Sequence, residues 1–269
     1  WSVVEKTALA DAEVEYEDHT SNTIYVKFLI NNSSDKDLLG ASIVIWTTTP
    51  WTIPGNRALA FGKDIKYSLI KINKVSADSL VEVGDKLIFA EELIKPVSEE
   101  IGMTDFESLK NFNGENLSDC ICEHLFKKIG YDFEVKPFHG DFVNLEQGTG
   151  IVHIAPGHGD DDYNLGIKNG VDIIQTVQDD GKFNHHAKGF ENEHIYKVDD
   201  KIAEKLNEFS KLLFKGTLRH SYPHSWRSKA PLIYRNTPQW FISMEKNNLR
   251  DIALKSIDET IFYPPQGQT

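Results

Sequence analysis

Apolar side chains follow strand-like patterns over more of this chain than helix-like ones. In the segment 23–30 they occupy every second position, which is typical of a half-buried strand. The run 41–46 is apolar apart from Ser42 and rich in β-branched residues, which favours a buried strand. Pro50 and Pro54 end this strand. Further strands are predicted at 57–61, 66–72, 86–90, 132–138 and 150–155.

Fewer segments show the period of a helix. The segment 200–215 places its apolar residues on one face. Asp199 or Asp200 is suited to cap its start, and Gly216 is suited to end it. Shorter helices are predicted at 91–101, 161–168 and 247–257.

The order of these elements indicates a fold class. Strands and helices do not alternate strictly, and the chain contains neither an internal repeat nor a low-complexity tract. The pattern predicts an α+β protein with a curved or barrel-like β core and peripheral helices. We expect one domain over residues 1–269, with its core at about 23–216 and with 1–22 and 217–269 as connecting arms.

Composition narrows the class of protein further. No stretch approaches the roughly 18 consecutive apolar residues of a membrane span, and no signal peptide is visible. The chain begins with Trp rather than Met, so we expect an excised or processed piece. Cys120 and Cys122 are too close for an ordinary disulfide and too few for a Cys-based zinc site. A reducing cytoplasm is the simplest interpretation.

Charge is spread unevenly along the chain. The net charge of −12 argues against general affinity for nucleic acid, which requires a surplus of Lys and Arg. The segment 209–244, in contrast, contains no acid. Basic and aromatic residues are interleaved there: Lys211, Lys215, Arg219, Tyr222, Trp226, Arg227, Lys229, Tyr234, Arg235 and Trp240. This basic segment suits contact with a phosphate backbone and bases, but also a solvated face or a surface against another domain.

Three threonines, Thr47, Thr48 and Thr49, follow the predicted buried strand where the chain must leave the sheet. Pro50 removes a backbone donor and disfavours a helical conformation at Thr49. Since adjacent side chains of a strand point to opposite faces, we expect only some of these hydroxyls to share one pocket. Threonine is also simply a good strand residue, so this segment alone identifies no site.

The segment 148–163 joins a short apolar strand carrying His153 to a glycine-rich loop and an acidic helix start. Glycines let a ligand approach the backbone closely. Asp160 and Asp161 are suited to the positive end of the helix dipole. An acid pointing into a pocket, such as Asp162, would instead bind a cation, either a metal ion or an ammonium group.

Other hydrolytic chemistries have weaker support. His153, His158 and Asp162 offer ligands for a divalent ion, so a metal-dependent hydrolase is one interpretation. Local spacing fixes no third strong ligand, however, and we expect no metal and no other cofactor. The chain has no Gly-x-Ser-x-Gly elbow and no P-loop, which argues against a serine triad and against P-loop nucleotide hydrolysis.

The two polar segments together resemble a known family. The first reads Trp-Thr-Thr-Thr-Pro-Trp-Thr-Ile-Pro-Gly-Asn from Trp46, and the second reads Gly-Thr-Gly-Ile-Val-His-Ile-Ala-Pro-Gly-His-Gly from Gly148. Both resemble peptides of the editing domain inserted in isoleucyl-tRNA synthetases. Segments 8–16, 220–227 and 237–241 also look like this family, so the resemblance spans essentially the whole chain.

The resemblance is specific to isoleucine enzymes of bacterial type. Thr49 stands where the related leucine and valine editing domains carry Arg, and those domains lack the pairing of Val152 with His153. Gly55 and Asp160 stand at positions where the family differs or varies. The class I aminoacylation signatures, His-Ile-Gly-His and Lys-Met-Ser-Lys-Ser, are absent from this sequence.

The resemblance implies post-transfer proofreading, which is the hydrolysis of valine wrongly attached to tRNA(Ile), with valyl-adenylate as an additional substrate. A pocket that fits isoleucine disfavours valine by only about 1–3 kcal/mol, a limit for which this pair of amino acids is itself the standard example. A second pocket that admits only valine would remove the errors. The partners implied are the tRNA 3′ end and the catalytic domain of the parent synthetase, without a membrane and with a monomer as the default.

The resemblance also implies roles for individual residues. Asp162 would bind the α-ammonium group of valine, and Thr48 and Thr49 would position the water or the terminal adenosine. His153 would line the side-chain pocket and block isoleucine by its bulk. A general-base role for His153 stays open, because the ordinary pKa of histidine suits proton transfer.

Three further residues would complete the site. Thr47 and Asn56 would shape it and form hydrogen bonds within it, and Trp46 would pack against the adenosine. A non-catalytic tRNA-binding module that uses the basic segment is the main alternative function. Another alternative is an editing domain from a valyl- or leucyl-tRNA synthetase. The identities of Thr49 and His153 disfavour this alternative.

Overall fold

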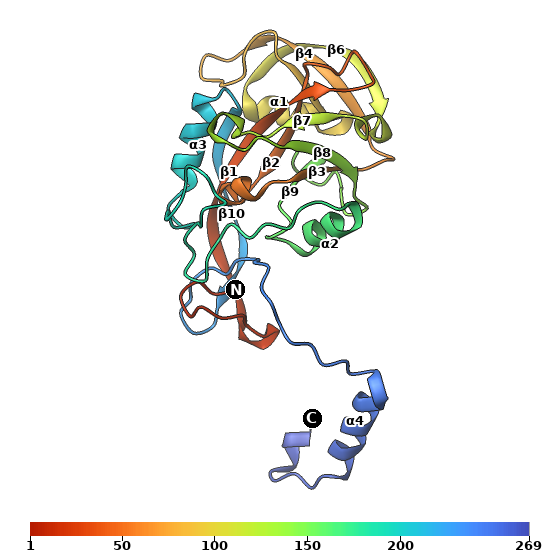
Figure 1. The fold of residues 1–269 in the computed structure, drawn as a ribbon, viewed down its shortest axis with the longest axis vertical. Helices are drawn as coiled ribbons and strands as arrows, with labels where there is room; N and C mark the ends of the chain where they lie inside the picture. Colours follow the sequence, from red (N-terminus) through yellow and green to blue (C-terminus); the bar gives the residue numbers. More distant parts are fainter. Residues whose placement is uncertain (269) are drawn as a thin grey trace. The chain divides into compact units, whose positions relative to one another are not determined.

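The computed structural model describes residues 1–268 and divides into two units, residues 1–236 and residues 237–269. A mixed sheet builds the first unit (Figure 1). Its strands are β1 (Val14–Asn32), β2 (Ser42–Thr47), β3 (Ala58–Phe61), β4 (Lys66–Val75), β5 (Lys86–Ala90), β6 (Met103–Asn113), β7 (Ile121–Glu123), β8 (Glu134–His139), β9 (Ile151–Ile154) and β10 (Leu212–Ser225).

The strands form one open sheet in the order β6-β4-β5-β2-β1-β7-β8-β3-β9, and β10 pairs with β1 outside this path. The pairs β2–β5 and β3–β8 are parallel and the other ladders are antiparallel. The sheet is not closed into a barrel. The predicted α+β class with a curved β core is confirmed.

Helices lie at the periphery of this sheet, as the sequence predicts. The first unit contains α1 (Ile94–Ile101), α2 (Asp160–Asn169) and α3 (Asp199–Glu208), with the short turns η1 (Asp11–Glu13), η2 (Pro50–Gly55), η3 (Glu91–Leu93), η4 (Gly114–Leu117) and η5 (Lys127–Ile129). The second unit contains η6 (Lys246–Asn248), α4 (Leu249–Glu259) and η7 (Pro265–Gln268). No helix within residues 1–268 has the length and apolar character to cross a membrane.

Strand β1 is more buried than its alternating pattern indicates. Every residue from Thr23 to Phe28 is buried, so both faces of the strand are covered there. Lys27, expected on a solvent-exposed face, is 9% exposed and forms an ion pair with Asp85 at 2.7 Å. The buried charge is therefore compensated by a partner from another segment.

The predicted helix over 200–215 is wrong in its second half. Helix α3 ends at Glu208, Ser210 adopts φ +56°, and the chain turns into β10. Leu212 then pairs with Val26 on β1. Leu212, Leu213 and Phe214 form a short apolar run that suits a buried strand as well as a turn of helix, and pairing with β1 decides between the two. Gly216 lies inside β10 and ends no helix.

Pairing of β1 with β10 extends beyond the core as a two-stranded antiparallel ribbon. Val14 lies opposite Ser225 at one end, and His19 lies opposite His220 in the middle. We call the paired residues 14–22 and 217–225 the ribbon. They belong to segments that the sequence suggests as arms, and the pairing ties these two segments to each other.

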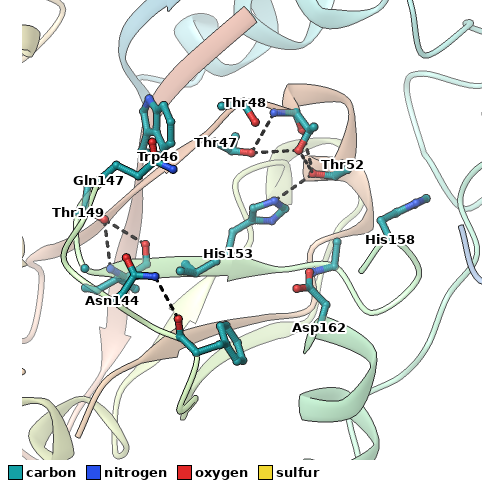
Figure 2. A pocket seen from close by; sticks show the side chains of 17 residues that line it. Trp46, Thr47, Thr48, Thr52, Asn144, Gln147, Thr149, His153, His158 and Asp162 are labelled. Carbon is teal, nitrogen blue, oxygen red and sulfur yellow. Dashed lines mark hydrogen bonds between the residues drawn. The ribbon is translucent and has the colours of Figure 1, made fainter. Parts of the chain in front are cut away.

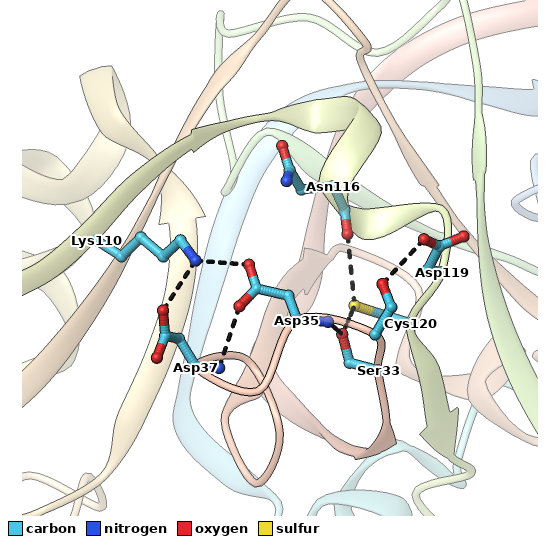
Figure 3. Close-up of polar contacts among 8 residues, drawn as sticks. Ser33, Asp35, Asp37, Lys110, Asn116, Asp119 and Cys120 are labelled. Atoms are coloured by element: carbon cyan, nitrogen blue, oxygen red, sulfur yellow. Dashed lines mark hydrogen bonds and ion pairs between the residues drawn. The ribbon is translucent and has the colours of Figure 1, made fainter.

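Polar contacts connect the loop after β1 to residues far away in the sequence (Figure 3). Lys110 of β6 donates to Asp35 at 2.7 Å and to Asp37 at 2.9 Å, and its ammonium group lowers the pKa of Asp35. The thiol of Cys120 contacts the Ser33 hydroxyl at 3.6 Å.

Cys120 and Cys122 are both free and buried, so the prediction of unpaired cysteines is confirmed.

Candidate functional site

A hollow of about 340 Å³ opens between the end of β2 and strand β9 (Figure 2). Both polar peptides line it, although they are about a hundred residues apart in the chain. The predicted site residues in its wall are Trp46, Thr47, Thr48, Thr49, His153 and Asp162. Asn56 does not line the hollow but lies fully buried behind His153.

The hollow is lined by all four threonines of the first peptide, Thr47, Thr48, Thr49 and Thr52. Strand β2 ends at Thr47, so the alternation of sides that would separate their hydroxyls stops there. Thr49 has φ −130° and ψ 69°, and Pro50 begins η2 directly after it. The printed hydroxyl contacts join Thr47, Thr49 and Thr52, so the expectation that only some of these hydroxyls share a pocket stays a prediction for Thr48.

The threonine hydroxyls form a short chain of contacts. The Thr47 and Thr49 hydroxyls lie 3.2 Å apart, and those of Thr49 and Thr52 lie 3.4 Å apart. Thr52 donates its hydroxyl proton to the carbonyl of Thr49 at 2.9 Å. Its oxygen is then free to accept, and Nε2 of His153 lies 3.0 Å away.

This arrangement defines the state of His153. Because Thr52 accepts, Nε2 carries the ring proton and Nδ1 keeps the lone pair, which faces the Asn56 amide at 3.5 Å. Burial, with a smaller contribution from His158, lowers the pKa of His153 to about 4. The imidazole is thus neutral near pH 7, and both of its nitrogens are engaged within the protein.

Asp162 brings a carboxylate into the hollow from the first turn of α2. Its Oδ2 accepts the Ala155 backbone N–H at 2.7 Å. A Cβ at position 159 would lie 3.2 Å from Oδ1, so Gly159 leaves room beside this second oxygen. Burial raises the pKa of Asp162 to about 6, against the opposing effect of the Ala155 amide. Asp160 and Asp161 are exposed, as expected for residues that only complement the helix dipole.

His158 lines the same hollow but is held by other groups. Its Nδ1 lies 3.1 Å from the Tyr234 carbonyl, its Nε2 lies 2.9 Å from the Thr176 hydroxyl, and Trp51 packs edge-on at 5.1 Å. Within residues 1–268, no three His, Cys, Asp or Glu side chains are grouped so that they could hold a metal ion. The geometry therefore gives no support to the metal-dependent alternative.

Some residues of the hollow have no clear signal in the sequence. Thr52 belongs to the first peptide, and its position three residues after Thr49 in a helical turn explains its contact with the Thr49 carbonyl. Phe142, Asn144 and Gln147 come from the loop before β9 and line the hollow too. No motif marks this loop, so only the fold reveals its place.

The basic segment proves to be largely neutralised. Its ion pairs are Lys211 with Glu123, Lys215 with Asp200, Arg219 with Asp18, Lys229 with Glu15 and Arg235 with Asp179. Arg227 instead lies over the Trp226 ring at 5.4 Å. Antiparallel pairing places the acidic start of β1 beside β10, which supplies acids that the segment itself lacks.

Comparison with known proteins identifies the family of this chain and agrees with its fold. A family model described as tRNA synthetases class I (I, L, M and V) matches residues 1–269, and the chain belongs to this family. It is 48% identical over 272 residues to the isoleucine–tRNA ligase of Pelagibacter ubique, a match that covers 100% of this chain and 29% of that protein. The isoleucine–tRNA ligase of Gluconobacter oxydans is 43% identical, over 98% of this chain and 29% of that protein.

Solved structures share the fold at low sequence identity. The crystal structure of GlLeuRS-CP1 matches with a TM-score of 0.55 and 13% identity, over 72% of this chain and 98% of that one. The P. knowlesi cytosolic leucyl-tRNA synthetase editing domain matches with a TM-score of 0.52 and 10% identity, over 72% and 96%. The chain spans about 29% of the length of its curated relatives and corresponds to their editing-domain region, so the resemblance predicted from the sequence is confirmed.

Proposed function

We propose that this chain hydrolyses the ester that joins valine to the terminal ribose of tRNA(Ile), as the post-transfer proofreading step of an isoleucyl-tRNA synthetase. The observation that carries the proposal is the shared hollow, in which Thr48, His153 and the Asp162 carboxylate meet. Such an ester is already activated. Positioning of a water molecule and stabilisation of the developing oxyanion therefore suffice for catalysis.

Asp162 is suited to bind the α-ammonium group of the bound amino acid. The Ala155 amide holds Oδ2, and the space left by Gly159 keeps Oδ1 open on one side. A cation beside this half-buried carboxylate would favour its ionised form and offset the cost of its burial. An amino group in its charged form therefore binds at this end of the hollow.

His153 is suited to act as a wall rather than as a base. Its Nε2–H points to Thr52, and its remaining lone pair faces Asn56. Neither nitrogen is free to take a proton from water without loss of a contact inside the protein. Its bulk sets the length of side chain that fits, and the vicinal ribose hydroxyl of the substrate assists the attacking water instead.

The remaining residues position the nucleoside end of the substrate. Thr48 and Thr49 lie at the mouth of the turn and are suited to hold the water or the adenosine hydroxyls. Trp46 offers its ring for packing against the adenosine, and Thr47 fixes Thr49 by accepting its backbone N–H at 3.1 Å. Asn56 acts from behind by orienting His153. Valyl-adenylate presents the same valyl group and is a second substrate under this proposal.

The parent enzyme supplies the rest of the reaction cycle. The catalytic domain would charge the tRNA, the 3′ end would reach this hollow, and the cytoplasm is the expected location. A monomer is the default under this proposal.

A deacylation assay tests the proposal. The chain is incubated with Val-tRNA(Ile) and separately with Ile-tRNA(Ile), with and without EDTA. We expect release of valine at least tenfold faster than release of isoleucine, and no effect of the chelator. Loss of activity with EDTA would establish the metal-dependent alternative, and a gel shift without deacylation would establish a binding module.

A further inference from the structure

A second hollow, of about 530 Å³, opens against strand β8 and shares no lining residue with the first. Glu134, Lys136 and Phe138, which are alternate residues of β8, form one wall. The end of α2 with the residues that follow it, and the segment 185–188, form other walls. Arg57, between η2 and β3, also lines this hollow. No residue of the second hollow has a part in the proposed hydrolysis.

Arg57 is half-buried, and one side of its guanidinium group is unused. Its Nη1 donates to the carbonyls of Pro54 at 3.3 Å and Asn56 at 2.6 Å, and the group lies over the Phe133 ring at 4.5 Å. Its Nε and Nη2 form no hydrogen bond within residues 1–268, and neither is a buried atom. These two nitrogens form the side of a guanidinium that binds both oxygens of an oxyanion at once.

The charge of Arg57 is only partly compensated. Burial lowers its pKa, because loss of water destabilises the charged form. Tyr131 and Asp172 oppose this effect, but no acid in the part of the chain that the structure describes forms an ion pair with Arg57. An anion bound beside the guanidinium would therefore stabilise its charged form, and this gain favours binding.

The other charges of the second hollow select the charge of the ligand. Lys136 pairs with Glu134 at 3.1 Å, so these two charges cancel. Lys188 donates to the Gly130 carbonyl at 2.8 Å and, like Asp172, has no ion-pair partner among the described residues. Together with the guanidinium, two cations and one acid remain, which leaves about one positive charge. A monoanion such as a carboxylate neutralises this charge, whereas a phosphate dianion would leave a negative excess.

Apolar side chains provide the remaining selectivity. Phe133, Phe138, Val171 and Ile174 line the second hollow, and each is half-buried. Their exposed surface would gain from being covered by an apolar group. A ligand with a carboxylate at one end and an apolar body at the other would satisfy both the guanidinium and these side chains.

We propose that the second hollow binds a small organic carboxylate with an apolar body. Its two oxygens accept from Nε and Nη2 of Arg57, Lys188 adds a second positive charge, and the body covers Phe133 and Phe138. The site is separate from the first hollow, so this proposal does not depend on the proposed hydrolysis.

Titration calorimetry with four small probes tests the class of ligand. Benzoate carries both the carboxylate and an apolar body, and we expect it to bind with a Kd of about 1 mM. Benzyl alcohol lacks the charge, acetate lacks the body, and inorganic phosphate lacks the body and has the wrong charge. Each of these three should bind at least about tenfold more weakly. Equal affinity for benzoate and either benzyl alcohol or phosphate would overturn the proposal.

Variants of Arg57 assign the binding to its guanidinium group. Arg57→Gln should weaken binding of benzoate about tenfold or more, since a hydrogen bond to a charged group is worth this factor. Arg57→Lys keeps the positive charge in the fold but loses the two-point contact, so a loss of several-fold is expected even if Arg57→Gln does not fold. Arg227→Gln is the matched control, because Arg227 also lacks an acidic partner among residues 1–268 and lies outside this hollow. Unchanged affinity in Arg57→Lys, or an equal loss in Arg227→Gln, would contradict the assignment.

His186 reports whether benzoate binds at this place. Burial, the neighbouring His185 and the charge of Arg57 lower the pKa of His186, which lines the second hollow. An anion beside Arg57 would offset part of this effect, so saturating benzoate should raise the pKa of His186 in an NMR titration. The pKa of His19, on the ribbon, should stay the same and serves as the control. Binding without a change at His186 would place benzoate elsewhere and overturn the proposal.

Discussion

The first hollow and the ribbon are the two regions that stand out by composition, and they differ in how their polar groups are satisfied. In the hollow, hydroxyls, an imidazole and a carboxylate have been brought together with room left beside them, as at Oδ1 of Asp162. In the ribbon, Arg219 pairs with Asp18 of the opposite strand, and Glu15 pairs with Lys229, which follows the ribbon in the chain. A ligand site leaves polar groups available to a ligand, whereas a structural surface pairs its polar groups within the protein.

Asp162 tests the hollow most strongly. Asp162→Ala removes the carboxylate that we assign to the ammonium group, and we expect kcat/KM for Val-tRNA(Ile) to fall about 10- to 100-fold. Asp161→Ala is the matched control, since Asp161 is the adjacent, exposed acid of the same helical turn. Rates near those of the unmodified chain for Asp162→Ala would remove this residue from the ammonium site.

Discrimination between amino acids tests the role of His153. His153→Ala enlarges the hollow, so we expect cleavage of Val-tRNA(Ile) to continue and cleavage of Ile-tRNA(Ile) to rise about tenfold or more, as one methylene is worth about 1–3 kcal/mol. Single-turnover deacylation of both substrates measures this change. If all hydrolysis disappears while tRNA binding persists, His153 acts as a base.

Asp162 and His153 also show which features of the site can be predicted from the sequence. The two peptides are recognisable because their residue types and order are local properties, so both sides of the hollow were predictable. The tautomer of His153 was not, because it depends on Thr52, a hundred residues away, donating its proton to the Thr49 carbonyl.

Ambiguous patterns explain the errors in the fold. Residues 209–215 suit a helix or a strand, and pairing with β1 decides between the two. The same pairing brings Asp18 and Glu15 of β1 beside Arg219 and Lys229. Acids from other segments pair with the remaining Lys211, Lys215 and Arg235. Predictions from local pattern are thus reliable for chemistry carried within one peptide and unreliable for properties that distant partners set.

A smaller effect, on stability, tests the electrostatics of the hollow. The pKa of Asp162 is raised from an ordinary 3.8 to about 6. Ionisation of Asp162 therefore lowers the stability of the folded state as the pH rises from 3.8 to about 6, and the full cost is present above about pH 6. Asp162→Asn mimics the neutral acid. We expect it to raise the free energy of unfolding at pH 8 by about 1–3 kcal/mol, with the gain lost as the pH falls through 6 towards 3.8. Urea unfolding at pH 8 and pH 3.5 measures it, and an equal effect at both values would contradict a raised pKa.

The ribbon provides the smallest expected effect. Arg219 pairs with Asp18 at 2.6 Å, but both side chains are largely exposed, so the pair contributes less than about 1 kcal/mol. Arg219→Ala should therefore change KM for Val-tRNA(Ile) by less than about twofold, with little change in its dependence on salt.

Arg227→Ala provides the comparison for these changes in KM and salt dependence, because Arg227 packs on Trp226 and has no acidic partner among the described residues. A several-fold rise in KM for Arg219→Ala, with a shallower salt dependence, would mean that the ion pair opens to bind phosphate, since each phosphate contact contributes about one unit to the salt slope. The ribbon would then also offer a polar group to a ligand, and the contrast with the first hollow would not hold there.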